Sequence, residues 1–146
     1  MSIQPSVVIP TATVSSASSD ALLKAALQAA THLGFEAAVA VVDSGGALKG
    51  FARSDGAAFL TADVAINKAW TAGAYGYPTD VWNDYIADPK VAPIANLPRM
   101  MPVGGGYPLL HEERLVGGIG ISGGSHQQDQ DACIAAVRQL GFEIFG

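Results

Sequence analysis

Lys68 is the residue whose setting most clearly requires a partner. Residues 57–75 have the apolar spacing of an α-helix, a second largely apolar face opposite, and Lys68 as their single cation. An unpaired ammonium on a helix covered from both sides would be costly. Lys68 therefore needs an anion, which is either a carboxylate of the chain or the carboxylate of a ligand. The intrachain candidates are Asp43, Asp55 and Asp63.

Arg53 and Thr71 are predicted to hold the same ligand carboxylate. Arg53 ends a predicted strand just before a turn, where its guanidinium either staples the turn or clamps a carboxylate with two hydrogen bonds. Thr71 would add a hydroxyl. An acid–base group beside this anion site would suit proton transfer on a small unsaturated acid, and the residues available are Asp43, Asp55 and His32.

Two glycine-rich segments, residues 104–106 and 117–124, have no Lys-Ser/Thr pair nearby, and on a chain of net charge −5 they are poor candidates for a nucleotide-binding loop. Their glycines either permit bulges and a close approach of sheet and helix, or leave backbone N–H groups free to hold a carboxylate. The second interpretation adds Gly105 and Gly106 to the site. The predicted ligand-binding residues are Lys68, Arg53, Thr71, Asp43, Gly105 and Gly106.

Nucleophilic acyl chemistry has little support. The one cysteine of the chain, Cys133, falls in an Ala-rich helical pattern without an adjacent base. We therefore expect Cys133 to be a small buried residue. A single cysteine fits a reducing compartment.

Size and charge limit the partners. A chain of 146 residues is expected to form one domain, residues 1–146, with residues 1–19 as an N-terminal extension. A net charge of −5 with scattered cations opposes nucleic-acid binding. The longest strictly apolar run, residues 37–42, is too short to span a membrane, and residues 1–19 resemble no signal peptide. We expect a cytoplasmic protein with no membrane partner.

Self-association is expected from the surface. Charged residues make up only 14% of the chain, which is too few to cover a monomer in the usual way. The predicted helix at residues 57–75 also presents Leu60, Val64 and Thr71 on a face with no obvious cover within the chain. We therefore predict a homo-oligomer larger than a dimer.

The remaining elements follow from periodicity and caps. Helices are predicted at residues 20–33, 57–75 and 79–86, and a last one follows Ser125, which has capping-box spacing to Gln128. Strands are predicted at residues 38–42, 47–53 and 114–121, with residues 100–103 and 108–110 flanking the glycines, and residues 88–99 form a loop. This order predicts an α+β sandwich in which a mostly antiparallel sheet of about five strands is covered by helices.

Five short segments occur in order along the chain: residues 41–46, 53–57, 68–72, 104–109 and 116–124, followed by Gln128 and Asp129. Together they resemble the GlcG/HbpS-like family of haem-binding or haem-degrading proteins. The resemblance covers residues 20–140 and implies a profilin-like sandwich, a small homo-oligomer and, for some members, bound haem.

Three histidines, His32, His111 and His126, are the plausible nitrogen donors for a haem iron. No pair has zinc-site spacing. His32 lies on the polar face of the first predicted helix and is the possible axial ligand; otherwise it is an ordinary surface histidine. We expect His111 and His126 to face solvent.

Three functions remain open. The first is an oligomeric small-molecule-binding protein with haem as the ligand that the resemblance suggests. The second is a cofactor-free enzyme of the tautomerase, hydratase or deaminase type, acting on a small unsaturated carboxylate in a catabolic pathway. The third is an accessory subunit without a ligand.

Overall fold

The structure is a computed structural model that describes residues 4–146, and it is built around one antiparallel sheet. The strands β1 (Ala38–Asp43), β2 (Leu48–Arg53), β3 (Gly106–His111) and β4 (Arg114–Ser122) lie in the order β2-β1-β4-β3. The helices are α1 (Ser16–His32), α2 (Leu60–Tyr75), α3 (Thr79–Tyr85) and α4 (His126–Gln139), with a short 3₁₀ helix η1 (Ala92–Asn96). The predicted α+β sandwich is confirmed.

The sheet of the described chain has four strands, so the prediction of about five was wrong. Residues 100–103 form no strand. Two of their backbone groups are hydrogen-bonded to side chains of α2 and α3 instead of to a neighbouring strand. The Met101 N–H donates to Thr71 Oγ1 at 2.9 Å, and the Val103 carbonyl accepts from Thr79 Oγ1 at 2.6 Å. Pro102 has no N–H to offer a ladder.

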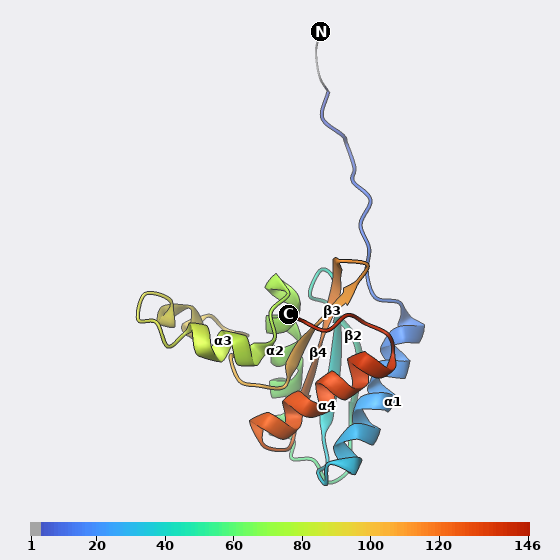
Figure 1. Ribbon diagram of the computed structural model, residues 1–146, viewed down its shortest axis with the longest axis vertical. Helices are drawn as coiled ribbons and strands as arrows, with labels where there is room; N and C mark the ends of the chain where they lie inside the picture. Colours follow the sequence, from blue (N-terminus) through green and yellow to red (C-terminus); the bar gives the residue numbers. More distant parts are fainter. Residues whose placement is uncertain (1–3) are drawn as a thin grey trace.

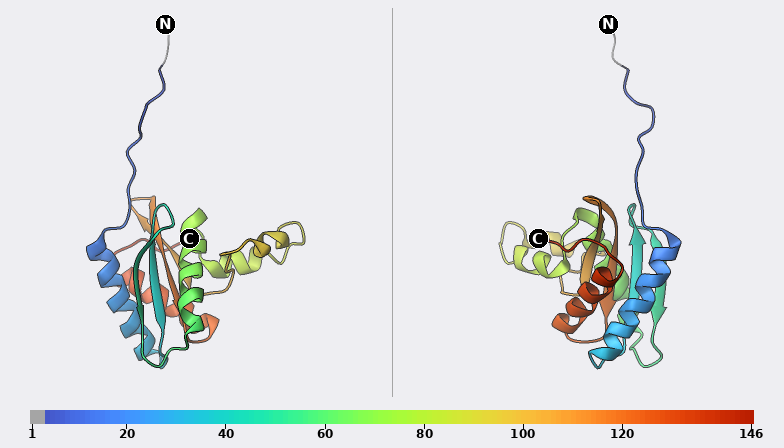
Figure 2. Two further views of the ribbon diagram at one scale, coloured as in Figure 1. Left: turned by 180° about the vertical axis from the view of Figure 1, so that it is seen from behind. Right: turned by 45° about the vertical axis from the view of Figure 1, so that its right-hand side comes forward.

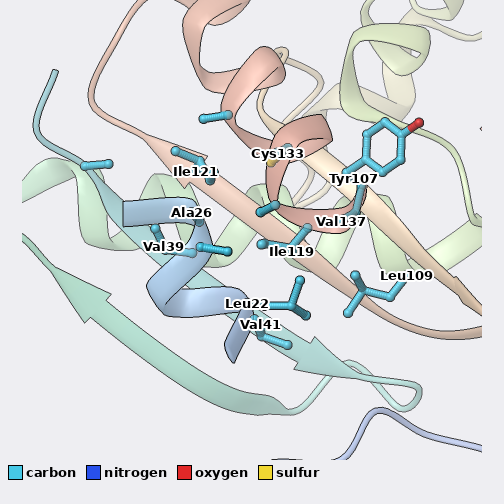
Figure 3. Packing of buried hydrophobic residues seen from close by; sticks show 14 of the residues in the cluster. Leu22, Ala26, Val39, Val41, Tyr107, Leu109, Ile119, Ile121, Cys133 and Val137 are labelled. Atoms are coloured by element: carbon cyan, nitrogen blue, oxygen red, sulfur yellow. The ribbon is translucent and has the colours of Figure 1, made fainter. Parts of the chain in front are cut away.

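Helices cover both faces of the sheet (Figure 1). One face packs against α1 and α4, and the main core lies there, with Leu22, Val39, Ile119 and Val137 among its buried residues (Figure 3). The other face packs against α2 in a smaller cluster. Glycines let α2 approach closely: a Cβ at Gly120 would overlap the Ala65 carbonyl oxygen. The close-approach interpretation of the glycine-rich strand is thus confirmed at this position.

The helix ends show which local signals were decisive. α1 begins at Ser16, four residues before the predicted start, because Ser15 is its N-cap and accepts from the Ser18 N–H at 3.1 Å. The capping box of Ser125 and Gln128 is present at the start of α4, as predicted. α2 begins at Leu60 rather than at residue 57.

Two parts of the chain leave the compact body. Residues 4–13 are extended and lead away from it, and α3 with η1 forms an arm that projects sideways from the sandwich (Figures 1 and 2). Val14 ties the N-terminal segment to the sheet, since its N–H donates to the Val116 carbonyl at 2.9 Å. Within residues 4–146, every helix is too short or too polar to cross a membrane.

Candidate functional site

Lys68 finds its anion within the chain. Its Nζ donates to Asp129 Oδ2 and to the Ile121 carbonyl, both at 3.0 Å, and the Lys68 and Asp129 side chains are each 3% exposed. The predicted intrachain partners, Asp43, Asp55 and Asp63, were wrong. Asp129 lies in the first turns of α4, 61 residues along the chain, and only the packing of α4 beside the end of β4 brings it to Lys68.

The pair is enclosed by Gly105 and Cys133, and these four residues are called the Lys68 cluster below. A Cβ at Gly105 would lie 2.7 Å from Lys68 Nζ, so only glycine fits there. Cys133 Sγ donates to the Gly105 carbonyl at 3.0 Å. Burial is the main cause that raises the pKa of the Asp129 carboxyl, and the Lys68 charge opposes it. Burial also raises the pKa of the Cys133 thiol far above its usual range.

The other predicted residues near Lys68 are already hydrogen-bonded. Thr71 is buried; its Oγ1 lies 2.7 Å from the Asn67 carbonyl oxygen and accepts from Met101. The Gly105 N–H donates to Gln130 Oε1 at 2.9 Å, and the Gly106 N–H donates to Thr79 Oγ1 at 2.8 Å. These side chains occupy the donors that a ligand carboxylate was expected to use.

Arg53 and Asp43 lie away from the Lys68 cluster. Asp43 is opposite Gly117, at the far end of β4 from Ile121, and its Oδ1 accepts from the Gly45 and Ala47 N–H groups to close the hairpin turn. Arg53 is on the edge strand β2, where Nη1 donates to the Ala57 carbonyl at 2.7 Å and staples the following turn. The groups required for acid–base chemistry on a bound acid are therefore not gathered around Lys68.

The three histidines are all exposed, as expected for His111 and His126. His32, in the last turn of α1, lines an open groove of about 380 Å³ between α1 and α4. His126 lines a pocket of about 300 Å³ together with Asp80 and Asp84. His111 is the last residue of β3, with Nε2 3.8 Å from Glu112 Oε1.

Of these positions, His32 fits a haem iron best. A histidine that ligates haem iron must lie beside apolar surface for the porphyrin, and the propionates of haem are anionic. The groove at His32 is lined by Ala25, Ala29, Leu33 and Ala135, with the amides of Gln28 and Gln139 and the carboxylate of Asp131. The pocket at His126 contains two carboxylates and would repel propionates. Across residues 4–146, no cluster of three or more His, Cys, Asp or Glu side chains could hold a metal ion.

Sequence reasoning did not identify Asp129 as the partner of Lys68. A signal for it exists, because Asp129 precedes Ala132 and Cys133 by three and four positions and so continues the apolar stripe of α4. A carboxylate on such a stripe requires a buried partner, just as Lys68 does on α2. Thr79 and Gln130 were missed as well, and nothing local marks either of them as a partner of the glycine backbone.

Known proteins with this fold and related sequences include haem-associated ones. Residues 14–138 match the family described as haem degrading protein HbpS-like. Corrinoid adenosyltransferase PduO of Salmonella typhimurium is 34% identical over 124 residues, which are 82% of this chain and 36% of that protein. The chain thus spans about a third of the length of that relative.

Two solved structures superpose closely. A PduOC:heme complex has a TM-score of 0.84 at 30% identity, covering 90% of this chain and 97% of that one. A double mutant of HbpS from Streptomyces reticuli has a TM-score of 0.88 at 27% identity, covering 97% and 96%. With the sandwich, the glycine-rich strand against α2 and this match in sequence, the chain belongs to the HbpS-like haem-degrading protein family.

Proposed function

We propose that this protein binds haem in the groove between α1 and α4, with His32 as the axial ligand. The observation that carries the proposal is the position of His32, an exposed imidazole at the edge of a partly apolar groove. Membership of the family and the likeness to a structure of a haem complex support the same ligand. A bound haem would supply an iron centre open to redox chemistry.

The groove residues have separate tasks in this proposal. His32 supplies nitrogen to the iron, and Ala29 and Ala135 offer small apolar contacts to the porphyrin plane. The amides of Gln28 and Gln139, which line the groove, would donate hydrogen bonds to the propionates. The carboxylate of Asp131 restricts where the propionates lie, because like charges repel.

Haemin titration tests the proposal. Wild type is expected to give a saturable Soret band, and His32→Ala is expected to shift and weaken it. His111→Ala is the matched control, since His111 is also exposed but lies at the end of β3, and it should leave the band unchanged. A Soret band that is identical in His32→Ala and wild type would exclude His32 as the ligand.

We also infer that the protein forms a homo-oligomer larger than a dimer. The predicted uncovered face of α2, which carries Leu60, Val64 and Thr71, is covered at Thr71, because the backbone of residues 99–101 bonds to this side chain. The start of α2 remains uncovered, since Leu60 is 65% exposed and the preceding residue, Phe59, is 87% exposed. Exposed apolar residues in a chain with so few charges favour self-association. Light scattering at micromolar concentration measures the mass, and a value near 15 kDa would contradict this inference.

A further inference from the structure

We propose that the N-terminal segment of one copy, residues 5–10, docks into an aromatic pocket on the projecting arm of a second copy. The inference goes beyond haem binding and rests on the proposed self-association, for which it names a contact. The aromatic pocket is defined by Tyr75, Tyr77, Trp82, Tyr85, Val91 and Ile94.

The N-terminal segment has apolar side chains with nothing to cover them. Val7, Val8 and Ile9 are 97%, 81% and 79% exposed, and Pro5 and Pro10 flank them. Proline and β-branched residues hold such a segment extended, so little conformational entropy is lost when it binds. Residues 4–13 carry no charge, which removes any electrostatic cost of placing them against an apolar surface.

The aromatic pocket offers complementary surface. It measures about 260 Å³, and Tyr75, Tyr77 and Tyr85 surround the Trp82 ring at centroid distances of 5.8 to 6.0 Å. All three tyrosines are exposed. Aromatic-lined grooves of this kind recognise extended, proline-flanked segments, whose conformation is preformed and whose carbonyl groups are free to accept hydrogen bonds.

Trp82 provides an independent sign that a partner is missing. The residue is only 3% exposed, and its indole nitrogen Nε1 has no hydrogen-bond acceptor among the described residues. Buried indole N–H groups normally have one. In this proposal a backbone carbonyl of the docked segment supplies it, and a change of rotamer in the exposed tyrosine side chains that flank the ring would admit the segment.

The geometry favours a second copy over the same chain. Val14 holds the base of the segment on the sheet through its bond to Val116. From there the segment leads away from the body, and the arm that carries the pocket projects in a different direction (Figures 1 and 2). Exchange of segments between copies would therefore add contacts without refolding either chain.

The first test is the mass of the assembled protein. Val8→Asp places a charge in the docked segment at a site that is exposed in the single chain, so folding is not at risk. We expect this variant to have a lower mass by light scattering than wild type. Ala17→Asp, which adds the same charge at an exposed position in α1, should assemble as wild type does.

The second test follows Trp82 directly. A synthetic peptide of residues 4–12 is added to the Val8→Asp chain that also carries Trp70→Phe, so that Trp82 is the one remaining tryptophan. We expect a saturable change in Trp82 emission. The affinity should fall about tenfold or more with a Val8→Asp peptide, or when Tyr85→Ala is added to the chain.

Each outcome bears on the proposal. An assembly whose mass Val8→Asp leaves unchanged, or Trp82 emission that does not respond to the peptide, overturns the docking while self-association stands. A wild-type mass of one chain overturns both, even where the peptide binds, because no second copy is then bound to receive the segment. The haem titration is independent of all three results.

Discussion

Lys68 Nζ and Asp129 Oδ2 lie 3.0 Å apart, and this pair joins the helices on opposite faces of the sheet. Lys68 belongs to α2 and Asp129 to α4, and both side chains also bond to backbone beside the end of β4. The second carboxylate oxygen of Asp129 accepts from the Gly124 N–H at 2.9 Å. Because each charge is buried, each depends on the other for its place in the fold.

Replacing Lys68 by Met should destabilise the protein by about 3–5 kcal/mol, because Asp129 would remain buried without its partner. Urea unfolding followed by circular dichroism gives the free energy of unfolding. Lys49→Met, on an exposed position of β2, is the control and should change it little. The double variant Lys68→Met with Asp129→Leu should recover part of the loss. Equal stability of Lys68→Met and wild type would show that the pair contributes nothing.

Asp129 should make stability depend on pH in an unusual direction. Burial raises the pKa of its carboxyl in the folded state above the unfolded value, so the folded state binds the proton more tightly. The stability that Asp129 contributes is therefore complete below its unfolded pKa and is lost as the pH rises through its folded pKa. Asp129→Asn cannot ionise and should lack this dependence.

The measurement is urea unfolding of wild type and Asp129→Asn across the range from acid to neutral pH. The free energy of unfolding of wild type, relative to the variant, is expected to fall as the pH rises. A relative increase over the same range would mean that the Lys68 charge outweighs burial at this carboxyl.

Gly105→Ala should be far more damaging than a substitution at another glycine with positive φ. Gly105 has φ of 122°, and a Cβ there would lie 2.6 Å from the Ile121 carbonyl oxygen and 2.7 Å from the Asp129 Cβ. Gly141→Ala is the matched control, with φ of 81° and nothing within 4 Å of the added Cβ. The control should lose about 1–2 kcal/mol from backbone strain. Gly105→Ala should lose about 1–3 kcal/mol more from overpacking. Thermal melting of both variants measures the difference. Equal melting temperatures would show that the Lys68 cluster rearranges to accommodate the added Cβ at little cost.

Cys133 should be unreactive in the folded protein. Its side chain is buried and burial raises the pKa of the thiol far above its usual range, so almost no thiolate forms at neutral pH. A chromogenic disulfide reagent should modify the thiol only at the rate of unfolding, and quickly in denaturant. Fast modification without denaturant would mean that the Lys68 cluster opens in the native state.

The sequence by itself determined what is local. The spacing of apolar residues predicted α2 and α4, the Ser125 and Gln128 pair predicted the start of α4, and the turn after β1 predicted the first hairpin. These signals act within one or two turns of chain, where backbone hydrogen bonds and caps are formed. The same reasoning showed that Lys68 needs an anion, because an unpaired charge on an apolar helix is costly in any fold.

Only the tertiary structure decided which groups meet. Asp129 reaches Lys68 through the position of α4 against the sheet, whereas Asp43 closes the hairpin turn, and Asp55 and Asp63 are exposed. Residues 100–103 could have formed a fifth strand, but Thr71 and Thr79 took their hydrogen bonds once α2 and α3 were packed. Likewise, aromatic rings from both α2 and α3 pack around Trp82, and its indole nitrogen has no hydrogen-bond acceptor among residues 4–146. Each of these outcomes depends on contacts between separate elements of the fold, and no local pattern of residues encodes the register and packing that create them.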